Sequence, residues 1–172
     1  VAPHLTEEYF RRMGHEGSVP VGGWPAYDPR LAMAELATAV VPSAQLFYQR
    51  ERERELRASL RTIRGAIDAY KQASDSGRIK KELNKSGYPP DLQSLVDGVD
   101  DAGSAKEGVK IYFLRSLPRD PFWPDATTPP ADTWGLRSYA SPPNDPQPGD
   151  DVYDVYSRSS RTGLNGVPYR DW

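Results

Sequence analysis

The sequence predicts an α+β fold in which one long helix comes first and small strands follow. The helix is indicated by five apolar residues at steps of 4, 3, 4 and 3, the spacing of a single buried helix face: Leu56, Leu60, Ile63, Ile67 and Tyr70. The strands are indicated by "DTWGLRSYA" and "DVYDVYSR", which alternate apolar and polar residues. This order of elements is typical of a small antiparallel sheet that covers one end of a helix.

The helical pattern extends from Leu31 to Ala73. Pro42 can only open such a helix or kink it, and if it opens the helix, the helix runs from Ser43 to about Ala73. A helix of about thirty residues is roughly 45 Å long, well above the average length. We expect its apolar face to pack on the sheet, so that Leu60→Ala costs about 2 to 5 kcal/mol.

The stretch "QRERERELR" on this helix interleaves both signs of charge. Glu51 faces Arg54 and Glu53 faces Arg57 at helical neighbour spacings, and each such pair is worth a few tenths of a kcal/mol. We interpret the stretch as a solvated face, on which Glu53→Ala costs well under about 1 kcal/mol. The alternative is a strip that contacts neighbouring copies of the chain.

The residues after the helix contain turn signals and short apolar runs. In "GYPPDLQSLVDG" the Pro89–Pro90 pair predicts a helix of about two turns, ended by Gly98. The segment 97–108 is acidic and rich in small residues, so we expect a mobile loop. "KIYFLRSLPRDPF" supplies a short apolar run that Pro118 ends.

Composition limits the classes of protein to consider. The 172 residues suffice for one domain, with 37% apolar residues for a core and 17 Pro and 14 Gly for much loop. A net charge of −2 gives no reason to expect a nucleic-acid partner. The absence of Cys excludes thiol nucleophiles and disulfides. The Pro-rich residues 1–30 form a predicted appendage, and residues 31–172 form the predicted domain.

Motifs for catalysis are weak, and we predict that the chain is not an enzyme. His4 and His15 lack the spacing of a helical zinc site, and no phosphate-binding Gly loop or nucleophile elbow is present. The many Asp residues leave open a carboxylate pair for glycoside hydrolysis, and also a Ca²⁺ site built from loop oxygens. Most of them precede Pro or lie in Gly- and Pro-rich turns, where such side chains cap backbone amides.

The order of several segments resembles the major pseudopilin of type II secretion systems and related pilin-like proteins. The resemblance covers about residues 36–172, and its segments are "ATAVVPSAQ", "ELRASLRTIRGAIDAYK", "GYPPDLQSLVD", "YFLRSLPRDPF", "ADTWGLRSYA" and "DVYDVYSRSSRTGLNGVPYRDW". It implies a pilin-like fold with a long N-terminal helix, a small antiparallel sheet and an ordered C-terminal loop. It also implies a non-enzymatic subunit of a periplasmic pseudopilus that drives protein export.

The resemblance further implies a location and partners. In that family a processed, methylated apolar segment anchors the subunit in the bacterial inner membrane and later forms the filament core. The partners are other pseudopilin subunits and inner-membrane components of the secretion system. The polar residues 1–30 stand where the anchor is expected, so we interpret them as foreign or as the mark of an unusual member. We expect this chain to be soluble and monomeric or weakly associated. An extracytoplasmic lectin-like binding module or adhesin is the alternative.

The last 21 residues, "VYDVYSRSSRTGLNGVPYRDW" (152–172), are named the C-terminal clasp here. In the family a Ca²⁺ ion holds the corresponding loop, and Asp171 matches one ligand position while Arg161 stands where another Asp is expected. We therefore predict a clasp that needs no ion or other cofactor, in which Arg161 pairs with Asp171 or another carboxylate while Tyr169 and Trp172 pack on the sheet. Calcium held by Asp171 and Asn165 is the alternative.

Overall fold

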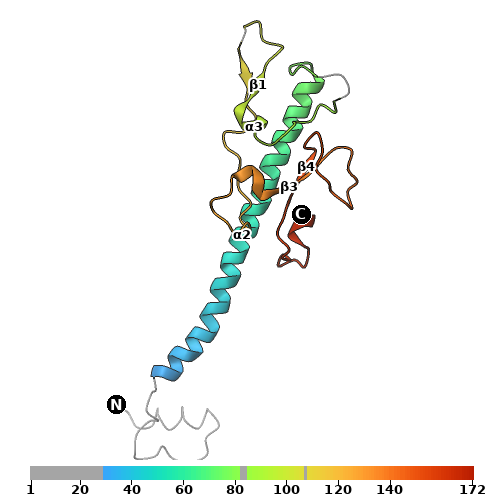
Figure 1. Cartoon of the computed structure of the whole chain (residues 1–172). Helices are drawn as coiled ribbons and strands as arrows, with labels where there is room; N and C mark the ends of the chain where they lie inside the picture. Colours follow the sequence, from blue (N-terminus) through green and yellow to red (C-terminus); the bar gives the residue numbers. More distant parts are fainter. Residues whose placement is uncertain (1–28, 82–84, 107) are drawn as a thin grey trace, which may run out of the picture. The chain divides into compact units, whose positions relative to one another are not determined.

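The computed structural model describes residues 29–81, 85–106 and 108–172, with side chains from Ala44 onward. Its architecture is α+β, with one long helix and small antiparallel sheets (Figure 1). This agrees with the fold class that the sequence predicts. The chain divides into two compact units, Val1–Gln45 and Leu46–Trp172, and the described strands all belong to the second. Residues 1–28 of the predicted appendage lie outside the described part.

The long helix, α2, runs from Pro29 to Asp75. These bounds confirm the helical pattern from Leu31 to Ala73. Pro42 lies inside the helix, so the alternative in which it opens the helix at Ser43 is wrong. A proline removes only one backbone donor, and a helix continues through it where neighbouring turns hold. Within the described residues, no helix is both long and apolar enough to cross a membrane.

The predicted strands pair with each other. Strand β3 (Trp134–Arg137) follows a 3-10 turn, η1 (Pro130–Thr133), and lies antiparallel to β4 (Asp154–Ser157). A second ladder joins β1 (Val99–Asp100) to β2 (Lys110–Ile111). The expected mobile loop at 97–108 is thus part of a hairpin, and the expected single sheet is two sheets of two strands each.

The short helix α3 (Ser94–Asp97) has one turn where two were predicted. Just before it, the Asp91 carboxylate accepts a hydrogen bond from the Ser94 backbone N–H at 2.7 Å. Gly98 ends the helix as predicted, with a φ of 74° that disfavours a side chain there.

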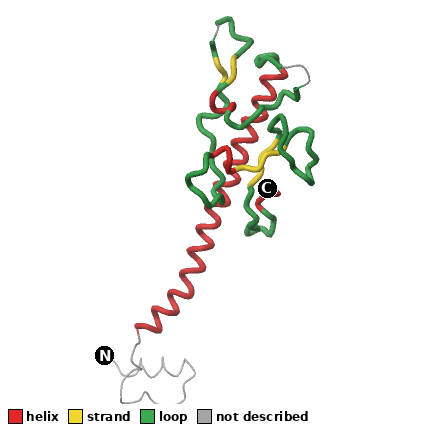
Figure 2. Tube along the Cα trace, in the orientation of Figure 1, coloured by secondary structure: helices red, strands yellow, loops and turns green. Residues whose placement is uncertain are grey.

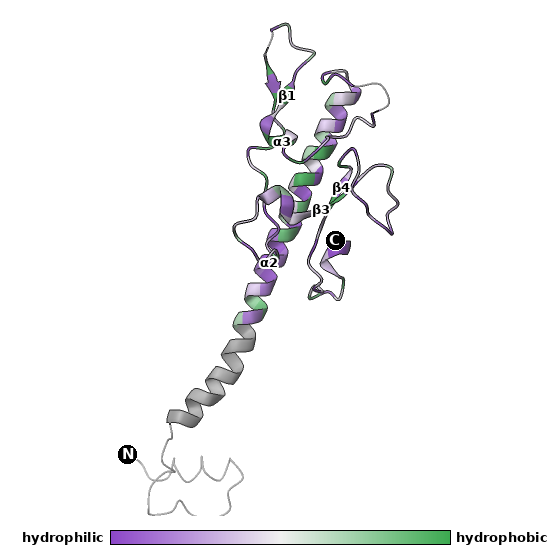
Figure 3. Cartoon of the chain, viewed as in Figure 1, coloured by the Kyte–Doolittle hydropathy of each residue, from purple (hydrophilic) through white to green (hydrophobic). Residues whose placement is uncertain are grey.

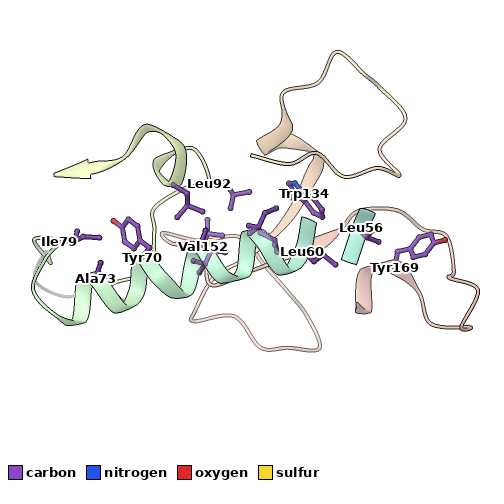
Figure 4. Packing of buried hydrophobic residues seen from close by; sticks show 14 residues of the cluster. Leu56, Leu60, Tyr70, Ala73, Ile79, Leu92, Trp134, Val152 and Tyr169 are labelled. Atoms are coloured by element: carbon purple, nitrogen blue, oxygen red, sulfur yellow. The ribbon is translucent and has the colours of Figure 1, made fainter. Parts of the chain in front are cut away.

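The core lies between the C-terminal half of α2 and the loops and strands packed on it. All five residues of the predicted helix face are buried, and they contact a cluster that includes Leu95, Trp134, Val152, Val155 and Tyr169. Figure 4 shows Leu56 and Tyr169 at one end of this cluster and Ala73 and Ile79 at the other. Figure 2 shows that most of the chain around the helix is loop, and Figure 3 shows hydrophobic positions on α2 where α3, β3 and β4 lie.

Candidate functional site: the C-terminal clasp

The C-terminal clasp is anchored by one fully buried aromatic ring. Tyr169, in the 3-10 turn η2 (Tyr169–Asp171), is 0% exposed. Its ring stacks on Phe122 with centroids 4.1 Å apart and meets Trp172 edge to face at 5.0 Å. Aromatic pairs in such geometries add stability beyond the area they bury. The segment therefore ends in a packed aromatic group and not in a loose tail.

Glu53 ties this ring to helix α2. It is 5% exposed, and its Oε1 atom accepts hydrogen bonds from the Tyr169 hydroxyl and from the Leu164 backbone N–H, each at 2.9 Å. Gln49 donates to the same tyrosine oxygen at 3.1 Å and to Glu53 at 3.2 Å. The predicted solvent exposure of Glu53 and its pairing with Arg57 are wrong, because the carboxylate points into the clasp.

Arg64 makes a second tie between α2 and the clasp. Its guanidinium donates to the Asp154 carboxylate at 2.7 Å and to the backbone oxygens of Val155 and Trp172 at 3.0 and 2.9 Å. The planar guanidinium can serve three acceptors at once, which a lysine cannot do with the same geometry. Arg57 also lies over the Trp172 ring, 4.1 Å from its centroid. The end of the chain is thus fixed against the helix by two arginines.

A buried carboxylate holds the turn that supplies the stacking partner Phe122. Asp120 is 1% exposed, accepts from the Phe122 backbone N–H at 2.8 Å, and accepts from the Ser157 hydroxyl at 2.6 Å. Its own N–H donates to Thr133 Oγ1 at 3.1 Å. This aspartate therefore joins three loop and strand segments.

The predicted clasp residues take different places in the structure. Tyr169 is buried and Trp172 is half-buried, but Arg161 is exposed and lies over the Phe122 ring at 5.4 Å, not against Asp171. No ion pair joins Arg161 to a carboxylate in the described part of the chain. Gly163 packs against the Trp172 ring, where a side chain would collide.

The two candidate calcium ligands already have protein partners. Asp171 lies 3.8 Å from the Arg170 guanidinium, and Asn165 Oδ1 accepts from the Val167 backbone N–H at 3.1 Å. Gly166 follows with a φ of 78°, which keeps this turn tight. Among the described residues, no three His, Asp, Glu or Cys side chains are placed to hold a metal ion together.

Electrostatics at the anchor favour the protonated phenol. Burial raises the pKa of Tyr169 above its ordinary value, and the hydrogen bond to Glu53 raises it further. The phenol therefore stays neutral and acts as the donor to the carboxylate. This arrangement holds two segments together.

A second feature is a cluster of tyrosines away from the clasp anchor. Tyr88 and Tyr139 stack with centroids 5.6 Å apart, and Tyr153 meets both edge to face. A cavity of about 810 Å³ adjoins Tyr88 and Tyr139. Its volume lies within the range of small-molecule sites. Its rim carries Lys80, Lys81, Lys85 and Asp150.

Sequence reasoning missed Glu53 and Arg64, although one signal was present. Glu53 stands three residues before Leu56 and so continues the apolar spacing of the buried face. A charged residue at a core position is paired when buried. Arg64 gives no comparable signal, because its acceptors lie about ninety residues or more further along the chain.

Comparison with known proteins does not place the chain in a family. No family model matches it, and no solved structure matches it. Partial matches occur with leucine–tRNA ligases. The ligase of Nocardioides sp. is 51% identical over 41 residues, which cover 24% of this chain and 5% of the ligase. The ligase of Acidothermus cellulolyticus is 32% identical over 101 residues, which cover 55% of this chain and 11% of the ligase. The chain therefore spans about a tenth or less of these relatives.

Proposed function

We propose that this chain is a pilin-like structural subunit of a periplasmic pseudopilus that drives protein export by type II secretion. The resemblance of its ordered segments to major pseudopilins supports this, as does an α+β architecture built on one long helix. The segments matched in leucine–tRNA ligases make up only 5% and 11% of those enzymes, which is too small a part to transfer their activity here.

The observation that carries the proposal is the fastening of the C-terminal clasp to helix α2. A subunit that assembles through its helix must keep the rest of its domain attached to that helix under load. Glu53 and Arg64 supply this attachment from two positions on the helix, and the buried Tyr169 ring lies between the segments that they hold. A structural subunit needs such ties and needs no catalytic group.

The proposal includes a location and partners. The native protein is anchored in the bacterial inner membrane and faces the periplasm, where it assembles with other pseudopilin subunits and with inner-membrane components of the secretion system. The clasp works without calcium, because the roles of a bridging ion are taken by Glu53 and Arg64.

Gene disruption in the source organism tests the proposal. Loss of the gene is expected to stop the release of exported proteins, which then accumulate in the periplasm. The full chain should restore release, and so should Tyr112→Ala, a change at a residue that is 64% exposed. Tyr169→Ala should not restore it. Unchanged secretion in the disrupted strain, with no filaments labelled by antibodies to the chain, would refute the proposal.

A lectin-like binding module is the second candidate, and the tyrosine-lined cavity favours it. Exposed aromatic rings beside amines and carboxylates can bind saccharides by stacking and hydrogen bonding. Tyr139 is 61% exposed and lines this cavity. Binding of the chain to a glycan array, abolished by Tyr139→Ala, together with normal secretion in the disrupted strain, would favour this candidate.

A further inference from the structure

Helix α2 carries a row of arginines beside its buried face. Their steps of 4, 3, 4 and 3 place them on one side of the helix. We call this set the arginine row: Arg50, Arg54, Arg57, Arg61 and Arg64. All are exposed except Arg64, which is half-buried. The row covers 14 residue steps of the helix, which is about 21 Å at the usual rise.

The glutamates interleaved with these arginines do not neutralise the row. Glu53 is buried and points into the C-terminal clasp. Glu51 pairs with Arg54 at 3.1 Å, but both side chains are largely exposed, so the pair is weak. Arg50 and Arg61 have no ion pair within the described residues. Glu55 is exposed and offsets one further charge. With Glu53 buried, the stretch 49–57 still presents more arginines than exposed glutamates.

The same chain carries an acidic loop of opposite charge at residues 144–151. Asp145 and Asp150 are exposed in it; Asp150 lies 4.0 Å from Lys85 of the same molecule, but its side chain is 92% exposed, so this pair is weak. The loop is held in shape by internal bonds: the Gln147 N–H donates to Ser141 Oγ at 2.8 Å, and the Tyr139 N–H donates to Asp151 at 2.8 Å. An ordered loop loses little conformational entropy when it binds.

Within one molecule the two surfaces meet only at one end of the row. A groove of about 660 Å³ is lined by Arg64 together with Asn144 and Pro146 of the acidic loop. Arg57 and Arg61 line a second groove of about 410 Å³, beside Asp171 and Trp172 of the C-terminal clasp. Arg50 and Arg54 line neither groove, so this end of the row is open to a partner that brings its own carboxylates.

We propose that the arginine row docks the acidic loop of a second copy of this chain. Complementary charges steer and orient such contacts. Each copy carries both an arginine row and an acidic loop, so it can contact one neighbour through each. Such contacts build an open filament unless the rotation between copies closes a ring. The inference rests on the proposed function and names the contact between successive subunits.

Charge reversal with mixing tests this contact. One variant carries Arg50→Glu and Arg61→Glu, and the other carries Asp145→Arg and Asp150→Arg. Each variant keeps one patch intact and loses most or all of the complementary charge of the other, so its self-association at low ionic strength should be at least about tenfold weaker than that of the unaltered chain. An equimolar mixture should recover association, because the intact row of one variant can then dock the intact loop of the other. Sedimentation equilibrium at low salt and at about 0.3 M salt measures both effects.

A matched control is available on the same chain. Lys106→Glu with Arg115→Glu changes the net charge as much as the arginine-row variant, at exposed positions outside α2. It should associate like the unaltered chain, and thermal melts should show that all variants are folded. The proposal is overturned if the unaltered chain stays monomeric at low salt, if the mixture fails to recover, or if the control behaves like the row variant. Row-dependent binding to anionic phospholipid vesicles without self-association would also overturn it, in favour of a membrane surface.

The role in export and the contact between copies can each be refuted without the other. If gene disruption stops secretion but charge reversal leaves self-association unchanged, the role in export stands and this contact is wrong. If mixing restores association but disruption leaves secretion intact, the contact stands and the role in export is wrong.

Discussion

The C-terminal clasp and the β1–β2 hairpin are both poor in regular structure, yet they are held in different ways. The clasp places a fully buried tyrosine against helix α2, donates hydrogen bonds to Glu53 of the helix, and accepts hydrogen bonds, one of them an ion pair, from Arg64. The hairpin is tied to the segment that follows α2 by the ion pair between Arg78 and Asp101, and it exposes 64% of Tyr112 and 40% of Val109. Its strands have two residues each.

The difference shows that strand length does not decide which segment is firmly attached. Burial of a large aromatic side chain removes far more apolar surface from water than a two-residue ladder does. Buried polar groups that are fully paired add to this, while an exposed ion pair contributes little. We therefore expect the hairpin to open locally at a lower free energy than the clasp.

The largest expected effect is that of removing the anchor ring. Tyr169→Ala should lower the free energy of unfolding by about 3 to 5 kcal/mol, as truncations of buried aromatic residues do. The matched substitution in the hairpin, Tyr112→Ala, should change the free energy of unfolding by less than about 0.5 kcal/mol, because the Tyr112 ring is largely exposed. Urea titrations followed by circular dichroism measure both. Similar losses for the two variants would remove the distinction between the regions.

The next effect concerns the buried carboxylate. Glu53→Ala should cost about 1 to 3 kcal/mol, because it leaves the buried Leu164 N–H without an acceptor and weakens the bonding of the Tyr169 hydroxyl. Glu53→Gln keeps an oxygen acceptor and should cost less. The control is Glu51→Ala, which removes a solvent-exposed ion pair with Arg54 and should change the free energy of unfolding by less than about 0.5 kcal/mol. An equally small loss at Glu53 would restore its interpretation as a surface residue.

Much of this fold could be predicted from the sequence, because local patterns encode it. The apolar spacing from Leu56 to Tyr70 locates the buried helix face, and alternation locates β3 and β4. The β1–β2 hairpin could not be predicted in this way, since two-residue strands among Asp and Gly residues carry no period. The clasp ties were also out of reach, because the bond from Tyr169 to Glu53 joins residues 116 positions apart.

A smaller effect should appear at alkaline pH. The raised pKa of Tyr169 means that the folded state holds its phenolic proton more tightly than the unfolded state does, whose pKa is about 10. This contribution to stability is fully present below pH of about 10 and is lost as the pH rises through the folded value. Tyr169→Phe cannot titrate, so urea titrations from pH 8 to 11 should show the unaltered chain losing more stability than the variant. An equal loss of stability in the unaltered chain and in Tyr169→Phe would mean that ionisation of the Tyr169 phenol is not coupled to unfolding.

The smallest expected effect is that of calcium, for which we predict no change in the thermal midpoint. An ion bound only by the folded state would raise stability by mass action, by about 2.7 kcal/mol at a hundredfold excess over its Kd. We expect no such ion in the clasp, because Glu53 and Arg64 already bridge its segments to α2. The thermal midpoint of the unaltered chain should therefore be the same in EDTA and in excess Ca²⁺. The midpoint of Asp171→Asn should also be the same in both. A calcium-dependent rise of several degrees that Asp171→Asn abolishes would instead make the clasp an ion-bound loop, and the contrast with the hairpin would then depend on the metal.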